Sequence, residues 1–200
     1  IPGVDGKSPA GIFRPSEAGL YWIAYQSDHA FVEIEAAKYA QYLKEEGLED
    51  VLAEREQRGE SALPGRDSYA RFDKALLRIG DAPADGFERV LGMPIELVPE
   101  TNPFTWQRGA ELVLRLELDG QPRSGQQLKL MRLAAPFTIL LARTDEHGRA
   151  HFTPELGGGW VASTVHQRRA QPEQKLEGDW EGQWASLSFE LGTSAPVVAH

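Results

Sequence analysis

The chain has 200 residues, a hydrophobic share of 41% and a formal net charge of -9 at pH 7. These values describe one large or two small globular domains with a buried core. The acidic balance disfavours nucleic acid and anionic lipid as partners, because surfaces rich in phosphate repel it. The chain has no cysteine, which excludes disulfides, thiolate metal sites and cysteine nucleophiles.

No segment has the character of a membrane span. The longest apolar run, LAAPFTILLA at 133–142, is about half of the roughly 18 residues that a spanning helix needs, and it contains a proline. The opening IPGVDGKSPAG has neither a basic nor an apolar signal-peptide region, so we expect a mature or trimmed chain.

The first 100 residues predict a short β segment followed by helices. Residues 19–34 alternate with a period of about two and are interrupted at 27–29, which predicts a β-hairpin. Apolar residues then recur every three to four positions, which predicts two helices separated by Gly47 and a third helix that ends before Gly80. The third helix depends on the spacing of Tyr69, Phe72, Leu76 and Ile79. We therefore divide this half into a partial first β module (1–34), a helical insertion (35–81) and a connector (82–100).

The second half predicts an antiparallel β-sandwich over 101–191, followed by a tail at 192–200. Leucines occupy every second position from Leu112 to Leu118, as on a half-buried strand, and DGQPRSG then turns the chain. Further strands are predicted at 137–143, 149–152, 160–166 and 185–191. The fold class is therefore mainly β with a helical insertion.

The stretch TDEHGRAHF at 144–152 allows two interpretations. His147 and His151 have the i, i+4 spacing that on a helix directs two imidazoles to one zinc ion, and Asp145 could complete a metal-dependent hydrolase site. However, Gly148 supplies the positive φ of a tight turn between two apolar strands. We predict that the segment is a hairpin tip and that the two histidines do not share a metal.

Several segments together resemble a known protein family. They include YLKEEGL, ELVPETNP followed by DGQPRSG, and the final DWEGQWASLSFEL. In this order they are similar to a bacterial periplasmic family of unknown function, formerly described as a NikM-like nickel-uptake component. The second module also resembles transthyretin-like or carboxypeptidase-regulatory-like sandwiches.

The resemblance implies a periplasmic protein of Ig-like or transthyretin-like sandwich modules with a helical insertion, associated with metal uptake. Members typically begin with a histidine followed by an acidic, aromatic stretch, whereas this sequence opens with IPGVDGKSPAG. We expect that a metal ligand at such a histidine, if the family uses one, lies outside residues 1–200.

His166 is the candidate metal ligand. It ends a predicted strand in ASTVHQRR and matches a VH step of the family that the chain resembles. The alternative is a strand-end histidine bonded to a neighbouring loop. If His166 binds a metal, we expect binding to weaken below about pH 6, because an imidazole must be neutral to coordinate and its unperturbed pKa is about 6.5.

Two further groups of side chains allow either a functional or a structural interpretation. Trp180 and Trp184 could form an aromatic platform for a flat ligand, or they could close one end of the sandwich. The acidic residues of 45–56 could attract cations, but a solvated helix face is the simpler interpretation, with Leu43, Leu48, Val51 and Leu52 packed on the sandwich.

The motifs do not predict an enzyme, since no G-x-S-x-G elbow, phosphate-binding loop or H-E-x-x-H motif occurs. We therefore expect a periplasmic, non-catalytic binding or accessory protein, with a transition metal ion of the nickel or cobalt type or an envelope transport protein as its partner. The alternatives are the metal-dependent hydrolase and a purely structural interaction domain of the envelope.

Overall fold

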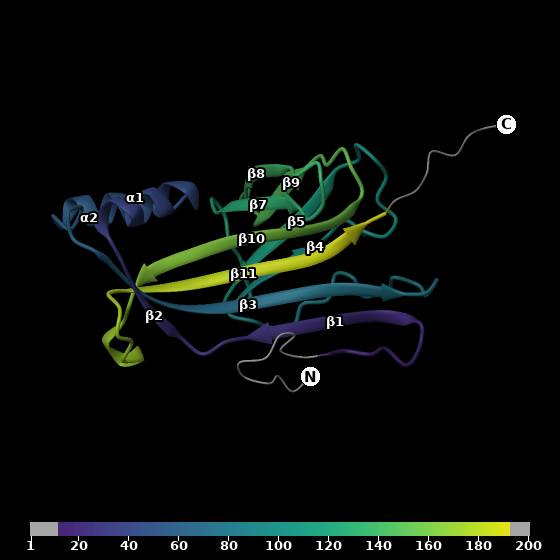
Figure 1. The fold of residues 1–200 in the computed structure, drawn as a ribbon, viewed down its shortest axis with the longest axis horizontal. Coiled ribbons are helices and arrows are strands. Elements are labelled where there is room, and N and C mark those ends of the chain that lie inside the picture. Colours follow the sequence, from purple (N-terminus) through teal and green to yellow (C-terminus); the bar gives the residue numbers. More distant parts are fainter. Residues whose placement is uncertain (1–11, 193–200) are drawn as a thin grey trace.

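A computed structural model describes residues 12–192, and it confirms a mainly β fold with a helical insertion (Figure 1). The start of the expected first module and residues 193–200 of the expected tail lie outside the described residues. The helices are α1 (Ala36–Glu45), α2 (Glu49–Gln57) and the short 3-10 helix η1 (Pro172–Gln174). The strands are β1 (Gly19–Gln26), β2 (Ala30–Ile34), β3 (Gly65–Ile79), β4 (Ile95–Pro99), β5 (Leu112–Leu118), β6 (Gln121–Pro122), β7 (Gln127–Arg132), β8 (Ile139–Arg143), β9 (Arg149–Phe152), β10 (Gly158–Arg169) and β11 (Trp180–Leu191).

The strands form two sheets that pack face to face. The large sheet has seven strands in the order β1-β3-β11-β10-β7-β8, and β2 pairs with β3 beside β1. The small sheet has the order β4-β5-β6, and β9 also pairs with β5. All pairs are antiparallel except β3 and β11, which run parallel. Strands from both ends of the described chain therefore belong to one sheet.

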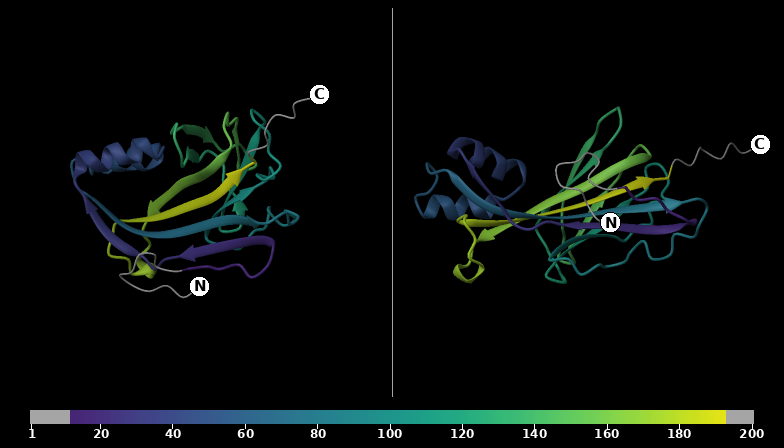
Figure 2. Two further views of the ribbon diagram at one scale, coloured as in Figure 1. Left: turned by 45° about the vertical axis from the view of Figure 1, so that its right-hand side comes forward. Right: turned by 60° about the horizontal axis from the view of Figure 1, so that its bottom comes forward.

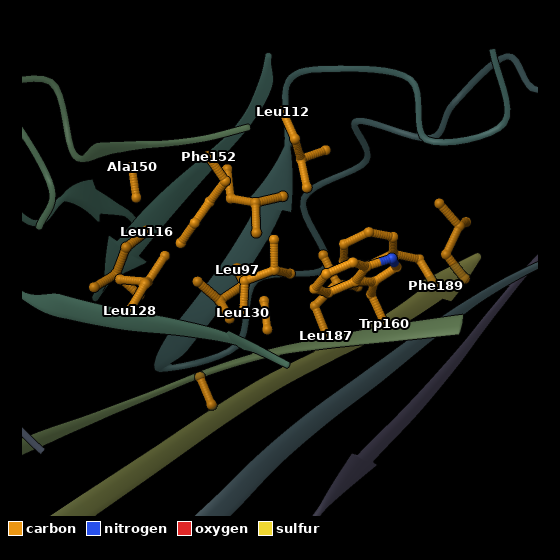
Figure 3. Close-up of a cluster of buried hydrophobic side chains, with 14 of the residues drawn as sticks. Leu97, Leu112, Leu116, Leu128, Leu130, Ala150, Phe152, Trp160, Leu187 and Phe189 are labelled. Carbon is orange, nitrogen blue, oxygen red and sulfur yellow. The ribbon is translucent and has the colours of Figure 1, made fainter. Parts of the chain in front are cut away.

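The core lies between the two sheets, and the leucine alternation predicted for 112–118 is confirmed. Leu112, Leu114 and Leu116 of β5 are all 0% exposed. They belong to the same cluster as Leu130 of β7 and Trp160 of β10, from the opposite sheet (Figure 3). Burying each leucine contributes about 1.5–3 kcal/mol, so this layer is a main source of stability.

Helices α1 and α2 lie at one end of the large sheet (Figures 1 and 2). They pack against Val165 and Trp180, whose side chains point away from the core between the sheets, and we call this face the outer face. The Glu35 carboxylate begins α1 by accepting the backbone N–H groups of Ala37 and Lys38. Gly47 follows α1 with a φ of 70°, as the prediction of two helices separated by a glycine requires. A second buried cluster forms beneath the helices from Tyr39, Leu43, Leu48, Val51, Val165 and Trp180. The predicted packing of the helical leucine stripe on the sheet is therefore confirmed.

The predicted third helix is wrong, because the residues before Gly80 form β3, the longest strand. The helical insertion is thus confined to α1 and α2, rather than extending over 35–81. Along β3, Ala70, Phe72, Lys74 and Leu76 are buried at every second position. Lys74 is charged and occupies one of these inward positions, so the sequence does not show an apolar residue at every second position. The apolar residues that remain are three to four positions apart, which is the spacing of a helix.

The hairpin predicted for 19–34 is also wrong. Strands β1 and β2 both pair with β3 and occupy successive stretches along it. At the interruption, Ser27 remains attached to β3, since its amide donates to the Arg71 carbonyl and its hydroxyl accepts the Arg71 amide. Long-range pairing with a central strand, rather than a local turn, therefore sets the path of this segment.

Candidate functional site: an aromatic pocket beside helix α1

A pocket of about 200 Å³ opens on the outer face of the large sheet, beside α1. Four elements that are distant in the sequence form it. The lining residues are Val32 and Ile34 of β2, Tyr42 of α1, Asp67, Tyr69 and Arg71 of β3, and Trp184 of β11.

Strand alternation places these side chains on one face. Asp67, Tyr69 and Arg71 are two residues apart on β3 and therefore point to the same side. Trp184 of the neighbouring β11 is paired with Arg71, so its indole joins that face. Gly182 is paired with Tyr69, and a Cβ atom there would lie 3.0 Å from both carboxylate oxygens of Asp67. The absence of a side chain at Gly182 leaves room for the carboxylate.

The aromatic rings form a continuous stack along one wall. Tyr39 and Tyr42 lie one turn apart on α1, with ring centroids 5.8 Å apart, and Tyr42 stacks on Trp184 at the same distance. The Arg71 guanidinium lies over the rings of Trp184 and Tyr69, at 5.3 and 5.6 Å from their centroids. The side chain of Arg71 is therefore the cation that occupies the ring faces on this side of the stack.

Two buried oxygen atoms of the pocket lining have no hydrogen-bond partner among the described residues. They are Oδ1 of Asp67 and the hydroxyl of Tyr42. Asp67 is only 3% exposed. A buried polar group without a partner costs about 1–3 kcal/mol, and such groups are rare in folded proteins. The pocket therefore contains polar groups that the protein itself leaves unsatisfied.

Burial raises the pKa of Asp67 to about 6, and the charge of Glu181 acts in the same direction. The nearby Gln167 side chain and Gly182 amide act in the opposite direction and lower the pKa of the carboxyl group. Since its pKa remains below 7, the Asp67 carboxylate is mostly ionised at neutral pH. The site thus carries a buried negative charge with one free acceptor atom.

Burial also raises the pKa of both stacked tyrosines, Tyr39 and Tyr42. Both phenols are therefore neutral at physiological pH. The Gln167 amide donates to the Tyr39 hydroxyl at 2.8 Å, which fixes that ring behind the pocket. The buried Tyr42 hydroxyl has no such contact within the described residues.

The two tryptophans have different roles. Trp180 is 1% exposed and packs beneath the helices, with the Arg169 guanidinium 4.3 Å from its ring centroid. It is a structural residue, but it packs on the outer face of the large sheet and not at the end of the sandwich as predicted. Trp184 is half-buried and lines the pocket, and its use as a platform for a ligand stays a prediction.

The acidic helix residues do more than face solvent. Glu46, which directly follows α1, accepts from Lys129 at 2.7 Å, and Glu49 of α2 accepts from Arg143 at 2.6 Å. Glu54 likewise accepts from Arg169. These ion pairs attach the helical insertion to strands β7, β8 and β10 of the large sheet.

His166 lies inside β10, which continues to Arg169, and not at the end of a strand as predicted. Its neighbour Val165 packs beneath the helices on the outer face. Because adjacent strand residues point to opposite faces, the imidazole faces the small sheet instead. His166 is therefore separated from the aromatic pocket by the large sheet itself.

The environment of His166 keeps its imidazole neutral. Burial lowers its pKa to about 4, the guanidinium groups of Arg123 and Arg168 lower it further, and the carboxylates of Asp50 and Asp119 oppose the shift. If this imidazole binds a metal, proton competition is expected near pH 4, and not below about pH 6 as an unperturbed imidazole would predict. Within residues 12–192, no group of three or more histidine, aspartate and glutamate side chains is arranged to hold a metal ion.

The 144–152 segment contains the predicted turn, with Gly148 at a φ of 74°. It is not a hairpin tip, however, because β8 pairs with β7 in the large sheet while β9 pairs with β5 in the small sheet. Asp145 Oδ1 accepts the backbone N–H groups of His147 and Arg149 and thereby stabilises the turn.

The residues proposed for a hydrolase do not converge. His151 Nδ1 lies 3.0 Å from Glu111 Oε1, whereas Nε2 on the other side of the ring lies 3.8 Å from Asp145 Oδ2. Two carboxylates on opposite nitrogens of one imidazole cannot share a single ion with it. His147 instead contacts Glu146 at 3.6 Å on the exposed turn.

Sequence reasoning singled out Trp184 but missed Asp67 and Tyr42. Asp67 falls within the segment predicted as a helix, where an aspartate is expected to face solvent. The one available signal was the position of Asp67 between Gly65 and Tyr69. This signal has a meaning only when β3 is recognised as a strand. Tyr42 fitted the helical period and was not distinguished from core residues.

No helix within residues 12–192 is long and apolar enough to cross a membrane.

Comparison with known proteins assigns the chain to a family. No curated protein and no solved structure matches the chain. A family model described as "Domain of unknown function (DUF4198)" matches residues 5–168, which include every pocket residue except Trp184 of β11. Because the match extends over most of its length, the chain belongs to the DUF4198 family of domains of unknown function.

Proposed function

We propose that this protein is a non-catalytic binding protein whose ligand occupies the aromatic pocket beside α1. The observation that carries the proposal is the pair of unpartnered buried oxygens, Asp67 Oδ1 and the Tyr42 hydroxyl, at a pocket lined by aromatic rings. Small-molecule sites typically combine apolar walls with a few fixed polar groups in this way. The pocket is smaller than the roughly 300–1,000 Å³ of drug-sized sites, so it suits a small ligand or one end of a larger one.

The chemistry of the pocket favours binding over catalysis. The Tyr42 phenol is neutral, and the Arg71 guanidinium is held against Trp184 and Tyr69. None of the seven lining residues is a histidine, serine, threonine or lysine, so the pocket lacks the hydroxyl–imidazole and amine groups of common catalytic sites.

A ligand screen followed by amide chemical shifts tests this proposal. Binding in the pocket shifts the amide signals of Tyr69, Gly182 and Trp184. The variant Val32→Trp places an indole at the mouth of the pocket and abolishes those shifts. A matched substitution on the exposed part of the chain, Val90→Trp, leaves them unchanged. A ligand whose shifts survive Val32→Trp binds elsewhere and contradicts the assignment of the site.

The narrower role that we propose is that of an accessory protein in the bacterial periplasm, serving uptake of a transition metal ion of the nickel or cobalt type. Its support within the described residues is His166, whose neutral imidazole is able to coordinate at physiological pH. Calorimetric titration with nickel and cobalt of the wild type, His166→Ala and Asp67→Asn tests this role. Loss of metal affinity in His166→Ala alone supports it, and unchanged affinity in that variant removes His166 from the site. Release of the protein by osmotic shock of the native host tests the location.

A second candidate, a structural interaction domain of the envelope, is favoured by one edge of the large sheet. Strand β8 is the last strand of that sheet, and it exposes Ile139 and Leu141 by 63% and 59%, next to Phe137 at 79%. Exposed apolar edge strands are templates for pairing with another chain. A photo-crosslinking residue at Ile139 then gives a discrete adduct in the native host, while the same residue at Glu190 gives none. Equal labelling at both positions argues against this role.

A further inference from the structure

The two unpartnered atoms of the pocket define what a ligand must supply. The free Oδ1 of the Asp67 carboxylate can only accept hydrogen bonds, and the Tyr42 hydroxyl is able to accept one. The Arg71 guanidinium lies over the Trp184 and Tyr69 rings, and it makes no hydrogen bond to either of the two unpartnered oxygens. An N–H donor is the kind of group that both oxygens are able to bind.

The charge in the pocket narrows the ligand further. An ionised, 3% exposed carboxylate repels an anionic group and stabilises a cationic one much more strongly than a neutral one. The rings of Tyr42 and Trp184 stand beside it, but Tyr39, Arg71 and their own stacking cover the ring faces. The buried carboxylate is therefore the feature that favours a positively charged donor.

The size of the pocket selects among cationic groups. Its volume is only about 200 Å³. This space accepts an ammonium group with a short alkyl stem. A planar guanidinium would have to compete for the same ring faces with Arg71, whereas a compact ammonium places three donors around one nitrogen.

We propose that the pocket binds a primary ammonium group, with one N–H donated to Asp67 Oδ1, a second to the Tyr42 hydroxyl oxygen, and the alkyl stem against Trp184. This inference rests on the proposed function, because it names the ligand chemistry of the same pocket. The ammonium group belongs either to a small alkylamine or to a lysine side chain of another protein, since both present the same chemistry.

The experiment is a titration of the full chain at pH 7.5, followed by amide chemical shifts. Three probes share a four-carbon stem and differ in charge: n-butylammonium, n-butanol and butyrate. A fourth probe, Nα-acetyl-lysine N-methylamide, presents the lysine side chain. Butylammonium or the lysine probe is expected to shift the Tyr69, Gly182 and Trp184 amides at concentrations at which butanol and butyrate do not.

Two variants and one matched control assign the contacts. Asp67→Asn keeps the shape and removes the charge, so ammonium affinity falls roughly tenfold or more. Tyr42→Phe keeps the ring and removes one acceptor, so affinity falls roughly threefold to tenfold. Asp73→Asn is the control, because Asp73 lies on the same face of β3 but binds Ser186 outside the pocket lining, at 2.7 Å. It is expected to bind as the wild type does.

Each outcome decides between the possibilities. If the lysine probe binds more tightly than butylammonium, the ammonium group belongs to a lysine of a protein partner. If butylammonium binds more tightly, the ammonium group belongs to a small amine. Both outcomes support the inference. Ammonium binding that is unchanged in Asp67→Asn overturns it. Binding of butanol or butyrate that Val32→Trp abolishes overturns the ammonium inference but leaves the binding function intact. If no member of the broader ligand screen binds in the pocket, both proposals fail.

Discussion

Lys74 Nζ lies 2.7 Å from Glu96 Oε1 between the two sheets, and each side chain is 1% exposed. This ion pair joins β3 of the large sheet to β4 of the small sheet. Glu96 also accepts the backbone N–H groups of Leu91, Gly92 and Met93, and the Lys74 ammonium lies 4.8 Å from the centroid of the Trp22 ring. A buried charge pair is tolerated when additional hydrogen bonds satisfy its remaining atoms, as they do here.

Removing one member of this pair is expected to destabilise the fold strongly. Lys74→Met leaves the Glu96 carboxylate buried without its counter-charge, which costs about 3–5 kcal/mol. The control is Arg143→Met, because the Arg143–Glu49 pair is 47% and 63% exposed and a solvent-exposed pair contributes about 0–1 kcal/mol. Urea unfolding of both variants measures the difference. Equal losses in the two variants would contradict the account of the buried pair.

The same lysine explains where sequence reasoning failed. Local patterns were sufficient for β5, whose leucines alternate without interruption, and for α1, whose cap and period agree. In β3 the inward-facing Lys74 broke the alternation, because its counter-charge comes from a different strand and is invisible locally. The pocket was lost for a related reason: its residues extend from Val32 to Trp184 and meet only through the pairing of β3 with β2 and β11.

Asp67→Asn is expected to change how stability depends on pH. The folded-state pKa of Asp67 is raised to about 6 from 3.8, so between these values the folded state holds a proton that the unfolded chain releases. Stability from this group is therefore present at low pH and is lost as pH rises through about 6. At pH 7.5 the carboxylate costs roughly 3 kcal/mol, given about 1.4 kcal/mol per pKa unit.

Unfolding of the wild type and Asp67→Asn at pH 4 and pH 7.5 measures this effect. The variant is expected to be more stable than the wild type at pH 7.5 and about equal to it at pH 4, with Asp73→Asn as the charge-matched control. A variant that is less stable at both pH values would mean that the carboxylate is satisfied in the folded protein. Stabilisation together with weakened ligand binding would fit the common conflict between stability and function at binding sites.

His166 is expected to contribute a pH dependence of the opposite sign. Its folded-state pKa is lowered from 6.5 to about 4, so the unfolded chain takes up a proton first as pH falls. Stability from the neutral, buried imidazole is present above pH 6.5 and is lost progressively towards pH 4, by roughly 3 kcal/mol in total. His166→Gln removes this loss, so its stability relative to the wild type rises as pH falls.

Two measurements check this prediction. Imidazole NMR signals of His166 are expected to titrate near pH 4, and unfolding at pH 7.5 and pH 4.5 gives the stability difference. His147→Gln is the control, because His147 lies on the exposed turn. Its unfolding at the same two pH values gives the change in stability on removing an imidazole that faces solvent. Titration of His166 near pH 6.5 would show that the imidazole reaches water, and it would restore the expectation that metal binding weakens below about pH 6.

The position of α1, and with it one wall of the pocket, is expected to depend on a glycine in β3. An added Cβ at Gly65 would overlap the ring of Tyr39, which is 0% exposed and hydrogen-bonded to Gln167. Gly65→Ala therefore forces the ring and its helix outward, and overpacking of this kind typically costs about 1–3 kcal/mol. Because Tyr42 lies on the same helix, the displacement also separates its ring from Trp184.

The matched control is Gly19→Ala in β1, where the nearest atom to a new Cβ is a Tyr21 ring carbon at an ordinary 3.4 Å. Replacing glycine by alanine in a strand without strain is expected to be neutral or slightly stabilising. Urea unfolding gives the stability of each variant, and the Gly65→Ala cost should shrink in a Tyr39→Leu background, where the offending ring is gone. The same cost in both backgrounds would show that the helix is not held through Tyr39. Chemical shifts of the Trp184 indole in Gly65→Ala then report whether the aromatic wall moves with the helix.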